Sequence, residues 1–254
     1  MNSLAESKAL VMGASSSVGI GAAIAAALKA EGAEVVISAR REEALAAVAA
    51  DLGVHHHVCD ITSAESVAAL FAWIDEHFGR LDTAVFSTGL NHFTPIRDFD
   101  PAAAMPCLQT QFLGGLTFIR ESAERMPDGG SIIMLSSLTA SRPAFGTSVY
   151  AGSKAGLEQI TRIAALEYAD QGVRVNAVAP GMTRTEMTDG MFGNPNLERA
   201  VLEEIPLGRM GTSEDIAHAA VYLADPRCFM TGETLSITGG AELRRIPTLK
   251  EIMG

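Results

Sequence analysis

The sequence predicts a doubly wound α/β domain, in which helices cover both faces of a parallel sheet. Short apolar runs and Ala-rich helical segments alternate along the chain. The apolar runs are uninterrupted, as is typical of strands buried on both faces. A length of 254 residues, 48% of them hydrophobic, suits one core, and no linker or repeat divides it. These observations together predict a single domain.

Seven strands are expected, because each apolar run is short and ends at a polar or turn residue. In chain order they cover Ala9–Met12, Glu34–Ser38, Val54–Cys59, Thr83–Ser87, Gly130–Ser136, Val173–Ala179 and Thr234–Thr238. The helices expected between them cover Gly19–Ala30, Glu42–Leu52, Ser63–Phe78, Pro101–Arg125, Ser148–Asp170 and Ser213–Ala224. Ser63 is a suitable N-cap for the third helix. This order requires right-handed crossovers between parallel strands.

Two segments interrupt the alternation. Ser87–Asp100 is a polar loop that contains proline, and Gly181–Pro206 is a long insertion rich in Met, Gly and Pro. Both follow predicted strands, so both should emerge at the carboxyl edge of the sheet, where open α/β sheets bind ligands. A substrate lid is therefore expected at about residues 182–206.

Charge and composition exclude several classes of partner. The net charge is −11 and no basic run occurs, so neither nucleic acid nor an anionic membrane is expected as a partner. The apolar stretches are too short for a membrane span, and residues 1–10 do not resemble a secretory signal. Cys59, Cys107 and Cys228 are far apart and odd in number, which favours buried free thiols and a cytoplasmic location.

A glycine-rich turn lies between the first strand and the first helix. It reads Gly13-Ala-Ser-Ser-Ser-Val-Gly19-Ile-Gly21. Glycines permit a tight turn and let a pyrophosphate approach the backbone, while the helix N-terminus offers unpaired N–H groups. The position of this turn predicts a Rossmann-type dinucleotide site, although a plain turn is the alternative. The residues expected at the cofactor are Gly13, Ser15, Ser16, Ser17, Gly19, Ile20 and Gly21.

The end of the second strand indicates which dinucleotide binds. It reads Ser38-Ala39-Arg40-Arg41, with no carboxylate. A carboxylate there would favour the ribose 2′-hydroxyl of NAD, whereas an arginine can pair with the 2′-phosphate of NADP. Arg40 therefore favours NADP(H), with NAD(H) still possible. The alternative is an exposed surface arginine.

Ser137, Tyr150 and Lys154 form the candidate catalytic set. Tyr150 and Lys154 are four residues apart on a predicted helix and so share one face, and Ser137 ends a strand upstream. A free tyrosine has a pKa of about 10, and a fixed ammonium near a nicotinamide cation would bring it toward neutrality. Ser137 can donate a hydrogen bond to a substrate oxygen that gains negative charge. Taken alone, a Tyr and a Lys at this spacing also fit an ordinary amphipathic helix.

With these motifs the chain resembles the classical short-chain dehydrogenase/reductase family, from about Lys8 to Gly240. The resemblance is carried by the glycine turn, Cys59-Asp60-Ile61, Ser136-Ser137, Tyr150-xxx-Lys154, Arg174-Val-Asn-Ala-Val-Ala-Pro-Gly181, Ile205-Pro-Leu-Gly-Arg-Met-Gly211 and Thr231-Gly-Glu-Thr-Leu.

This resemblance implies a role for each matching residue. Tyr150 would be the general acid in reduction and the base in oxidation. Lys154 would hold the nicotinamide ribose and tune Tyr150, and Ser137 would position the carbonyl. The positions that match the family's cofactor contacts are Asp60, Ile61, Ser87, Gly89, Tyr150, Lys154, Pro180, Gly181, Thr183 and Thr185. A homotetramer is also implied, with the long helices around Gln111 and Tyr150 at one interface.

The chain departs from the family pattern at four places. Five residues separate Gly13 from Gly19, where the family usually has three. Met12 replaces the usual Thr before the turn, and Ser87 replaces an Asn beside the cofactor. The family's fourth catalytic residue, an Asn, aligns with Gln111, whose longer amide would change the reach of a proton relay.

Other candidates have simpler interpretations. His55, His56 and His57 are consecutive on a strand, so they cannot all face one metal, and no metal site is expected. His92 lies in an active-edge loop, where a substrate contact is an alternative to a structural role. The residues that could line a pocket beneath the lid, or could equally be ordinary packing, are Met182, Met187, Met191 and Phe192.

The sequence thus predicts an NADP(H)-dependent oxidoreductase that interconverts a small ketone or aldehyde and an alcohol. A 3-oxoacyl thioester reductase is a narrower alternative, which the lack of a basic cluster disfavours. Arg142 and Arg184 are candidate contacts for an acidic substrate. A dinucleotide-binding sensor or scaffold with little turnover is the alternative from another class.

Overall fold

The computed structural model describes residues 3–185, 188, 195–248 and 251. Its centre is a seven-stranded parallel sheet in the order β3-β2-β1-β4-β5-β6-β7. The strands are β1 Lys8–Met12, β2 Glu34–Ala39, β3 His55–Val58, β4 Thr83–Phe86, β5 Gly130–Leu135, β6 Val173–Pro180 and β7 Thr234–Ile237. Because β2 lies on one side of β1 and β4 on the other, the strand order reverses between β1 and β4. Doubly wound sheets bind their ligands at such a reversal.

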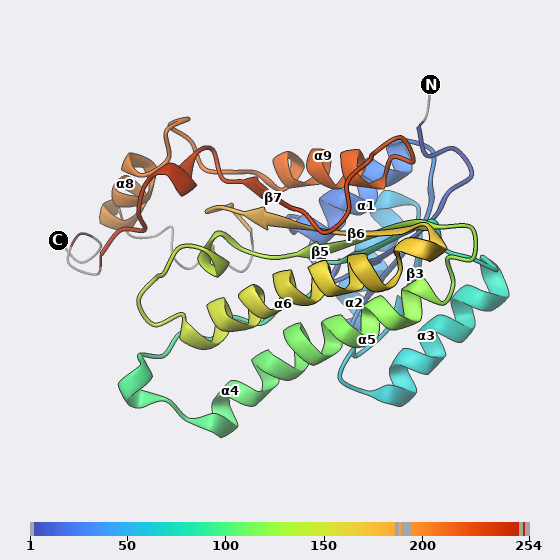
Figure 1. Ribbon diagram of the computed structural model, residues 1–254, viewed down its shortest axis with the longest axis horizontal. Coiled ribbons are helices and arrows are strands. Elements are labelled where there is room, and N and C mark those ends of the chain that lie inside the picture. The colour runs from blue at the N-terminus through green and yellow to red at the C-terminus, as the bar shows by residue number, and fades with distance from the viewer. Residues whose placement is uncertain (1–2, 186–187, 189–194, 249–250, 252–254) are drawn as a thin grey trace.

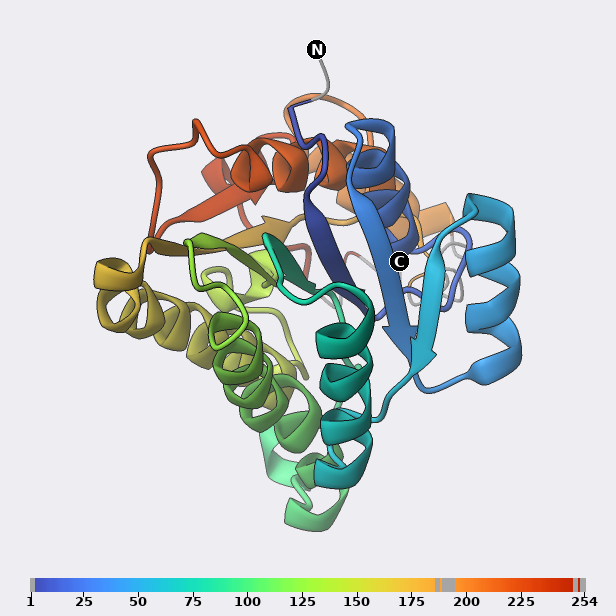
Figure 2. The same cartoon turned by 90° about the vertical axis from the view of Figure 1, so that its right-hand side faces the viewer.

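Helices cover both faces of this sheet, as Figures 1 and 2 show. The helices are α1 Ile20–Ala30, α2 Glu42–Leu52, α3 Ala64–His77, α4 Pro101–Leu108, α5 Gly114–Ala123, α6 Ser148–Glu167, α8 Pro195–Glu203 and α9 Ser213–Ala224. Within the described residues, no helix has the length and apolar character needed to cross a membrane.

Each face of the sheet has its own apolar core. Alternate residues of β1 point to opposite faces, so Val11 packs with α1, α2 and α9 while Leu10 packs with α3, α5 and α6. Both side chains are fully buried. The predicted α/β fold with helices on both faces is therefore confirmed, and the strand and helix boundaries differ from the predicted ones by a few residues at most.

Ser63 caps α3 as predicted. Its hydroxyl accepts a hydrogen bond from the N–H of Ser66 (3.2 Å), which satisfies one of the free donors at the helix N-terminus.

The helix predicted over Pro101–Arg125 is not continuous. A π-helical turn over Gln109–Leu113 separates α4 from α5. The side chain of Gln111 explains this turn, because it is buried and bonded to groups outside its own helix. A wide turn of this kind is common at functional positions of helices.

The insertion predicted as a loop contains a helix, α8. Its residues Leu197 and Val201 are buried against Leu138, which follows β5, and against Met210 and Ala241. The helix forms because this packing buries its apolar face, and it therefore lies over the carboxyl edge of the sheet (Figure 1). Residues 186–187 and 189–194 of the predicted lid, including Met187, Met191 and Phe192, lie outside the described residues.

Candidate active site

The glycine turn requires glycine at two positions. Gly13 has a φ of +98°, and a Cβ there would lie 2.7 Å from the backbone of Ser87 and Thr88. A Cβ at Gly21 would lie 2.5 Å from the carbonyl oxygen of Gly13. Because backbone atoms cannot move aside easily, only glycine lets β1, the turn and β4 approach so closely. This approach places Ser87 beside the turn, with its N–H bonded to the carbonyl oxygen of Met12 (2.8 Å).

The turn leads into the N-terminus of α1. Gly19 caps this helix without any side-chain hydrogen bond, so backbone N–H groups at the helix start are open to a ligand. Ser16 stays inside the turn and accepts from the N–H of Gly19 (3.0 Å). These features fit a pyrophosphate, which binds N–H groups and the positive end of a helix dipole.

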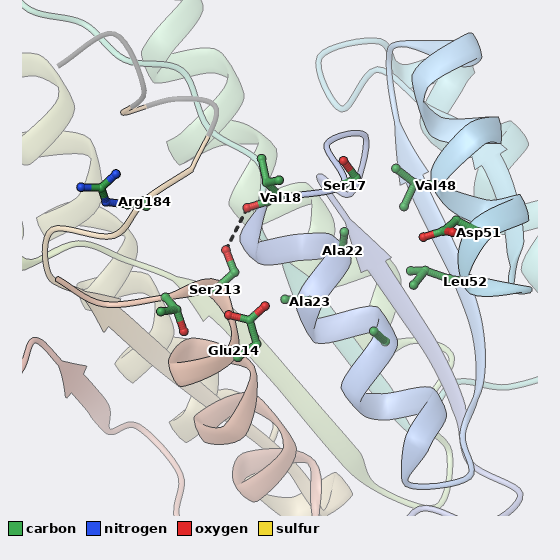
Figure 3. A pocket seen from close by; sticks show the side chains of 12 residues that line it. Ser17, Val18, Ala22, Ala23, Val48, Asp51, Leu52, Arg184, Ser213 and Glu214 are labelled. Carbon is green, nitrogen blue, oxygen red and sulfur yellow. Dashed lines mark hydrogen bonds between the residues drawn. The ribbon is translucent and has the colours of Figure 1, made fainter. Parts of the chain in front are cut away.

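Two side chains hold the turn from opposite sides. The Arg41 guanidinium donates to the hydroxyl of Ser15 (3.2 Å) and to its carbonyl oxygen (3.1 Å). From α9, the Ser213 hydroxyl donates to the carbonyl oxygen of Val18 (3.0 Å), as Figure 3 shows. Neither contact was predicted. The pairing of Arg41 with Ser15 ties the turn to the end of β2.

A groove of about 420 Å³ lies on the outer side of α1, between α2 and the start of α9 (Figure 3). It is lined by Ser17 and Val18 of the turn, by small alanines of α1 and by Asp51 and Glu214. Ser137, Tyr150 and Lys154 are not among its lining residues. We therefore do not assign the substrate to this groove.

Arg40 and Asp60 lie near one another at the ends of β2 and β3. Burial raises the pKa of the Asp60 carboxyl, but two hydrogen bonds from Thr62 and the charge of Arg40 outweigh this effect and keep the pKa low. Arg40 is exposed, and the preceding Ala39 is buried and small. Ile61, the residue after Asp60, is in close contact with Gly114 of α5. Among the described residues, this corner thus offers one exposed arginine whose side chain has no hydrogen-bond partner.

Ser137, Tyr150 and Lys154 converge at the carboxyl end of β5. The Ser137 side chain lies close enough to the Tyr150 hydroxyl to lower the pKa of the phenol. The Lys154 ammonium lies 5.9 Å from the centroid of the Tyr150 ring and donates to the carbonyl oxygen of Leu135 (2.6 Å). The Ser137 hydroxyl also accepts from the N–H of Thr139 (3.2 Å), which fixes its orientation.

Burial dominates the acid–base character of this set. It raises the pKa of Tyr150 above its usual value, and the hydrogen bond from Ser137 lowers it only in part. It lowers the pKa of the Lys154 ammonium to about 8, because the ammonium is desolvated. The protein's own groups therefore do not bring the phenol toward neutrality, since Lys154 faces the ring and Leu135. An oxidised nicotinamide held beside Tyr150 would supply a positive charge that lowers the pKa of the phenol.

Gln111 uses its amide nitrogen fully and leaves its oxygen free. Its Nε2, which carries two hydrogens, lies within hydrogen-bond distance of three acceptors, the carbonyl oxygen of Leu90 (3.2 Å), Cys107 Sγ (2.7 Å) and Ser153 Oγ (3.1 Å). Its Oε1 is buried with no hydrogen-bond partner among the described residues. A Cβ at Gly89 would lie 3.1 Å from that oxygen and 3.7 Å from Lys154 Nζ, so Gly89, Gln111 and Lys154 share one corner.

The segment after β6 forms the opposite wall. Gly181 continues the ladder, with its N–H bonded to the Ile237 carbonyl (3.0 Å), and a Cβ there would lie 2.9 Å from Thr238 Cα. Thr183 is buried and donates to the carbonyl oxygen of Gly181 (3.1 Å). The N–H of Thr185 donates to Thr188 Oγ1 (3.0 Å) within the same segment. With Pro180 at the strand end, these residues form one compact turn.

The structure also places the other residues that the sequence singled out. His55 and His57 lie near Trp73 of α3, at the far edge of the sheet. Among the described residues, no group of three or more His, Cys, Asp or Glu side chains is arranged to hold a metal ion. The three cysteines are buried and free. Met182 packs with the cluster of Leu138 and α8.

A parallel sheet with a glycine turn at its order reversal, joined to a Ser, Tyr and Lys set at the same edge, defines a dinucleotide-dependent oxidoreductase. A family model described as enoyl-(acyl carrier protein) reductase matches residues 13–242. Carbonyl reductase family member 4 of Danio rerio is 33% identical over 229 residues, covering 89% of this chain and 94% of the relative. The 3-oxoacyl-(acyl-carrier-protein) reductase FabG of Rickettsia bellii is 36% identical over 250 residues, covering 94% and 98%.

A solved short-chain type dehydrogenase/reductase from Mycobacterium ulcerans superposes with a TM-score of 0.92 at 29% identity, covering 96% of this chain and 92% of that one. The chain belongs to the short-chain dehydrogenase/reductase family. It is accordingly an oxidoreductase that acts on CH–OH and keto groups with a nicotinamide cofactor.

Proposed function

We propose that the chain interconverts ketones or aldehydes and alcohols with NADP(H), and that Tyr150 is its general acid and base. The observation that carries the catalytic assignment is the buried Lys154 ammonium beside the Tyr150 ring, with the Ser137 side chain close enough to the Tyr150 hydroxyl to lower its pKa. No other titratable pair in the described part of the chain joins a buried amine to a phenol at the carboxyl edge of the sheet.

Each group has a defined role in this proposal. The chemistry that a bound nicotinamide supplies is hydride transfer. The Ser137 hydroxyl binds the carbonyl oxygen, and Tyr150 gives that oxygen its proton during reduction. Lys154 holds the ribose hydroxyls and stabilises the phenolate left on Tyr150. Burial keeps Tyr150 protonated until that moment, because the raised pKa disfavours early ionisation.

The test is NADPH oxidation measured over a panel of ketones and aldehydes. We expect turnover by the wild type, a loss of at least about 100-fold in kcat for Tyr150→Phe, and a much smaller change in cofactor affinity. If the wild type binds the cofactor but turns over none of the compounds, the result would instead favour a dinucleotide-binding sensor or scaffold. The complete set of Ser137, Tyr150 and Lys154 disfavours that class.

The preference for NADP(H) over NAD(H) is supported by the end of β2. Arg40 is exposed beside Asp60, and Ala39 leaves the space that a carboxylate would occupy in an NAD enzyme. Arg41, by contrast, is engaged with Ser15 of the turn. Arg40 is therefore the residue proposed for the 2′-phosphate.

Reduction of 3-oxoacyl thioesters is a second candidate activity. It is favoured by the names of relatives such as FabG of Rickettsia bellii and by the description of the matching family model. The net charge of −11 disfavours docking of an acidic carrier protein. The panel should therefore include a 3-oxoacyl thioester of a short thiol. Its reduction tests the activity on thioesters without the docking of a carrier protein.

We further propose that residues 182–206 form a substrate lid. The helix α8 of this segment packs on Leu138, the residue directly after Ser137. A movement of α8 would therefore shift the position of Ser137. Deleting the apolar contact by Val201→Ala should raise KM for the ketone more than KM for NADPH.

A homotetramer in the cytoplasm completes the proposal. Leu113, Leu116, Ile163 and Leu166 are exposed on the outer face of α5 and α6 and the turn before them, and three free cysteines suit a reducing compartment. Light scattering on the purified protein tests the assembly, and a monomer would overturn it.

A further inference from the structure

The loop after β4 and the segment that leads into Tyr150 meet, and both present aromatic rings to solvent. The N–H of Thr94 donates to the carbonyl oxygen of Gly146 (2.7 Å), which ties the loop after β4 to the segment that leads into Tyr150. The rings of Phe93 and Phe145 lie on these two loops, 6.5 Å apart, and are 65% and 54% exposed. Exposed neighbouring aromatic rings beside a catalytic group are typical of a surface that contacts an apolar ligand.

The arginines around the same edge already have acceptors. Arg142 donates through Nε to the carbonyl oxygen of Glu242 (3.0 Å). Arg184 is paired with Glu198 (2.6 Å), and Arg209 with Asp215 (2.6 Å). Arg199 on α8 is exposed, but one cation does not form an anion-binding patch. The described residues around the site therefore offer no cluster of free positive charge for a carboxylate, a phosphate or an acidic carrier protein.

A second buried polar atom in this region lacks a partner, besides the Oε1 of Gln111. The Nε2 of His92 is buried and makes no hydrogen bond within the described residues. His92 lies between Gly89, which is beside Lys154 and Gln111, and Phe93, whose ring meets Gly146. A buried ring nitrogen without a partner is unfavourable, and a ligand that supplies the missing hydrogen bond would remove the penalty.

We propose that the substrate is an uncharged, aryl-substituted or similarly apolar carbonyl compound with a second oxygen near the reacting carbonyl, and that His92 binds this second oxygen. The proposal rests on the oxidoreductase function proposed above and specifies its substrate. Phe93 and Phe145 would contact the apolar part, and His92 would discriminate between substrates with and without the second oxygen.

The experiment compares 1-phenylpropane-1,2-dione with the monoketones 1-phenylpropan-1-one and 1-phenylpropan-2-one. NADPH oxidation is measured for the wild type, His92→Phe and His92→Asn. His92→Phe keeps a ring but removes both nitrogens, and His92→Asn restores a hydrogen-bonding group. The ratio of kcat/KM between variant and wild type is taken for each ketone, so that the higher intrinsic reactivity of the dione cancels.

We expect His92→Phe to lower kcat/KM for the dione by about 10-fold, the effect of one buried hydrogen bond, and to change the monoketones less than about twofold. His92→Asn should recover part of the loss on the dione. Equal losses on all three ketones, or no loss on the dione, would overturn the role of His92 while leaving the oxidoreductase function intact.

Acetoacetyl-CoA, a charged oxoacyl thioester, is the opposing probe. Higher kcat/KM for this thioester than for the dione would overturn the uncharged substrate class. Failure of the wild type to reduce any carbonyl compound, with NADPH bound, would overturn the proposed function itself and this inference with it.

Discussion

The Lys154 ammonium points at the carbonyl oxygen of Leu135, 2.6 Å away, while it lies 5.9 Å from the centroid of the Tyr150 ring. It is 4% exposed and has no carboxylate partner among the described residues. A buried, unneutralised cation is unfavourable for folding. Its retention therefore favours a role in function, where the charge can act on Tyr150 and on the cofactor.

Replacing Lys154 should stabilise the protein while it inactivates the enzyme. Burial lowers the Lys154 pKa to about 8, against 10.5 for an ordinary lysine, so the unfolded chain binds more protons between these pH values. The stability of the wild type should consequently rise with pH over that range, and its penalty is complete below pH 8. At pH 7, Lys154→Met should raise the free energy of unfolding by about 1–3 kcal/mol. Urea denaturation at pH 7 and at the upper end of the range measures both.

The gain from Lys154→Met should disappear above the ordinary lysine pKa of 10.5, where the wild-type amine is neutral in both states. A variant that is less stable than the wild type at pH 7 would show that the hydrogen bond to Leu135 outweighs the burial of the charge.

Arg40 and Arg41 should affect cofactor binding differently although they are adjacent. Arg40→Ser removes the exposed cation beside Asp60 and should raise KM for NADPH by about 10- to 100-fold, with little change for NADH. Arg41→Ser removes two hydrogen bonds to Ser15, so it should loosen the glycine turn and weaken both cofactors. Initial rates with each nucleotide measure the difference. The same selectivity in both variants would contradict the separate roles.

The sequence could predict the fold and the proximity of the candidate catalytic residues because both depend on local patterns. Uninterrupted apolar runs mark strands buried on two faces, and the spacing of Tyr150 and Lys154 on a helix places them on one side regardless of tertiary detail. The contact of Arg41 with Ser15 joins residues 26 positions apart. A sequence can place both at the carboxyl edge, but not their side-chain orientations.

The π-helical turn and α8 could not be predicted for a related reason. Gln111 is held by Leu90 and Ser153, which are distant in the sequence, and this tertiary bonding overrides the regular helix. Likewise α8 is stabilised by packing on Leu138 and Ala241. The signal that could have indicated α8 was the apolar spacing of Leu197 and Val201, four residues apart.

Two glycines should respond to alanine in opposite ways. At Gly21 a Cβ would lie 2.5 Å from the carbonyl oxygen of Gly13, so Gly21→Ala should lower the free energy of unfolding by more than about 2 kcal/mol and abolish cofactor binding. Gly152 is exposed in α6 with nothing within 4 Å, so Gly152→Ala should stabilise by about 0.5–1 kcal/mol. Thermal unfolding compares the pair. A neutral Gly21→Ala would mean that the turn can widen away from α1.

Gln111→Asn should harm both folding and turnover, although it restores the residue usual in the family. The shorter amide cannot reach Leu90, Cys107 and Ser153 together, so buried acceptors lose their donor and the free energy of unfolding should fall by about 1–2 kcal/mol. The free Oε1 would also withdraw from the corner that it shares with Lys154 and Gly89, and we expect kcat to fall about 10-fold with little change in KM for NADPH.

The matched control for Gln111→Asn is Gln109→Asn in the same π-helical turn. Gln109 is exposed, so its shortening should change stability by less than about 0.5 kcal/mol and leave kcat unchanged. Urea denaturation and steady-state rates on both variants make the comparison. Equal behaviour of the two would show that the buried amide contributes nothing beyond its place in the turn. A loss confined to Gln111 would instead show that this chain has adapted the surrounding groups, Cys107 above all, to the longer side chain.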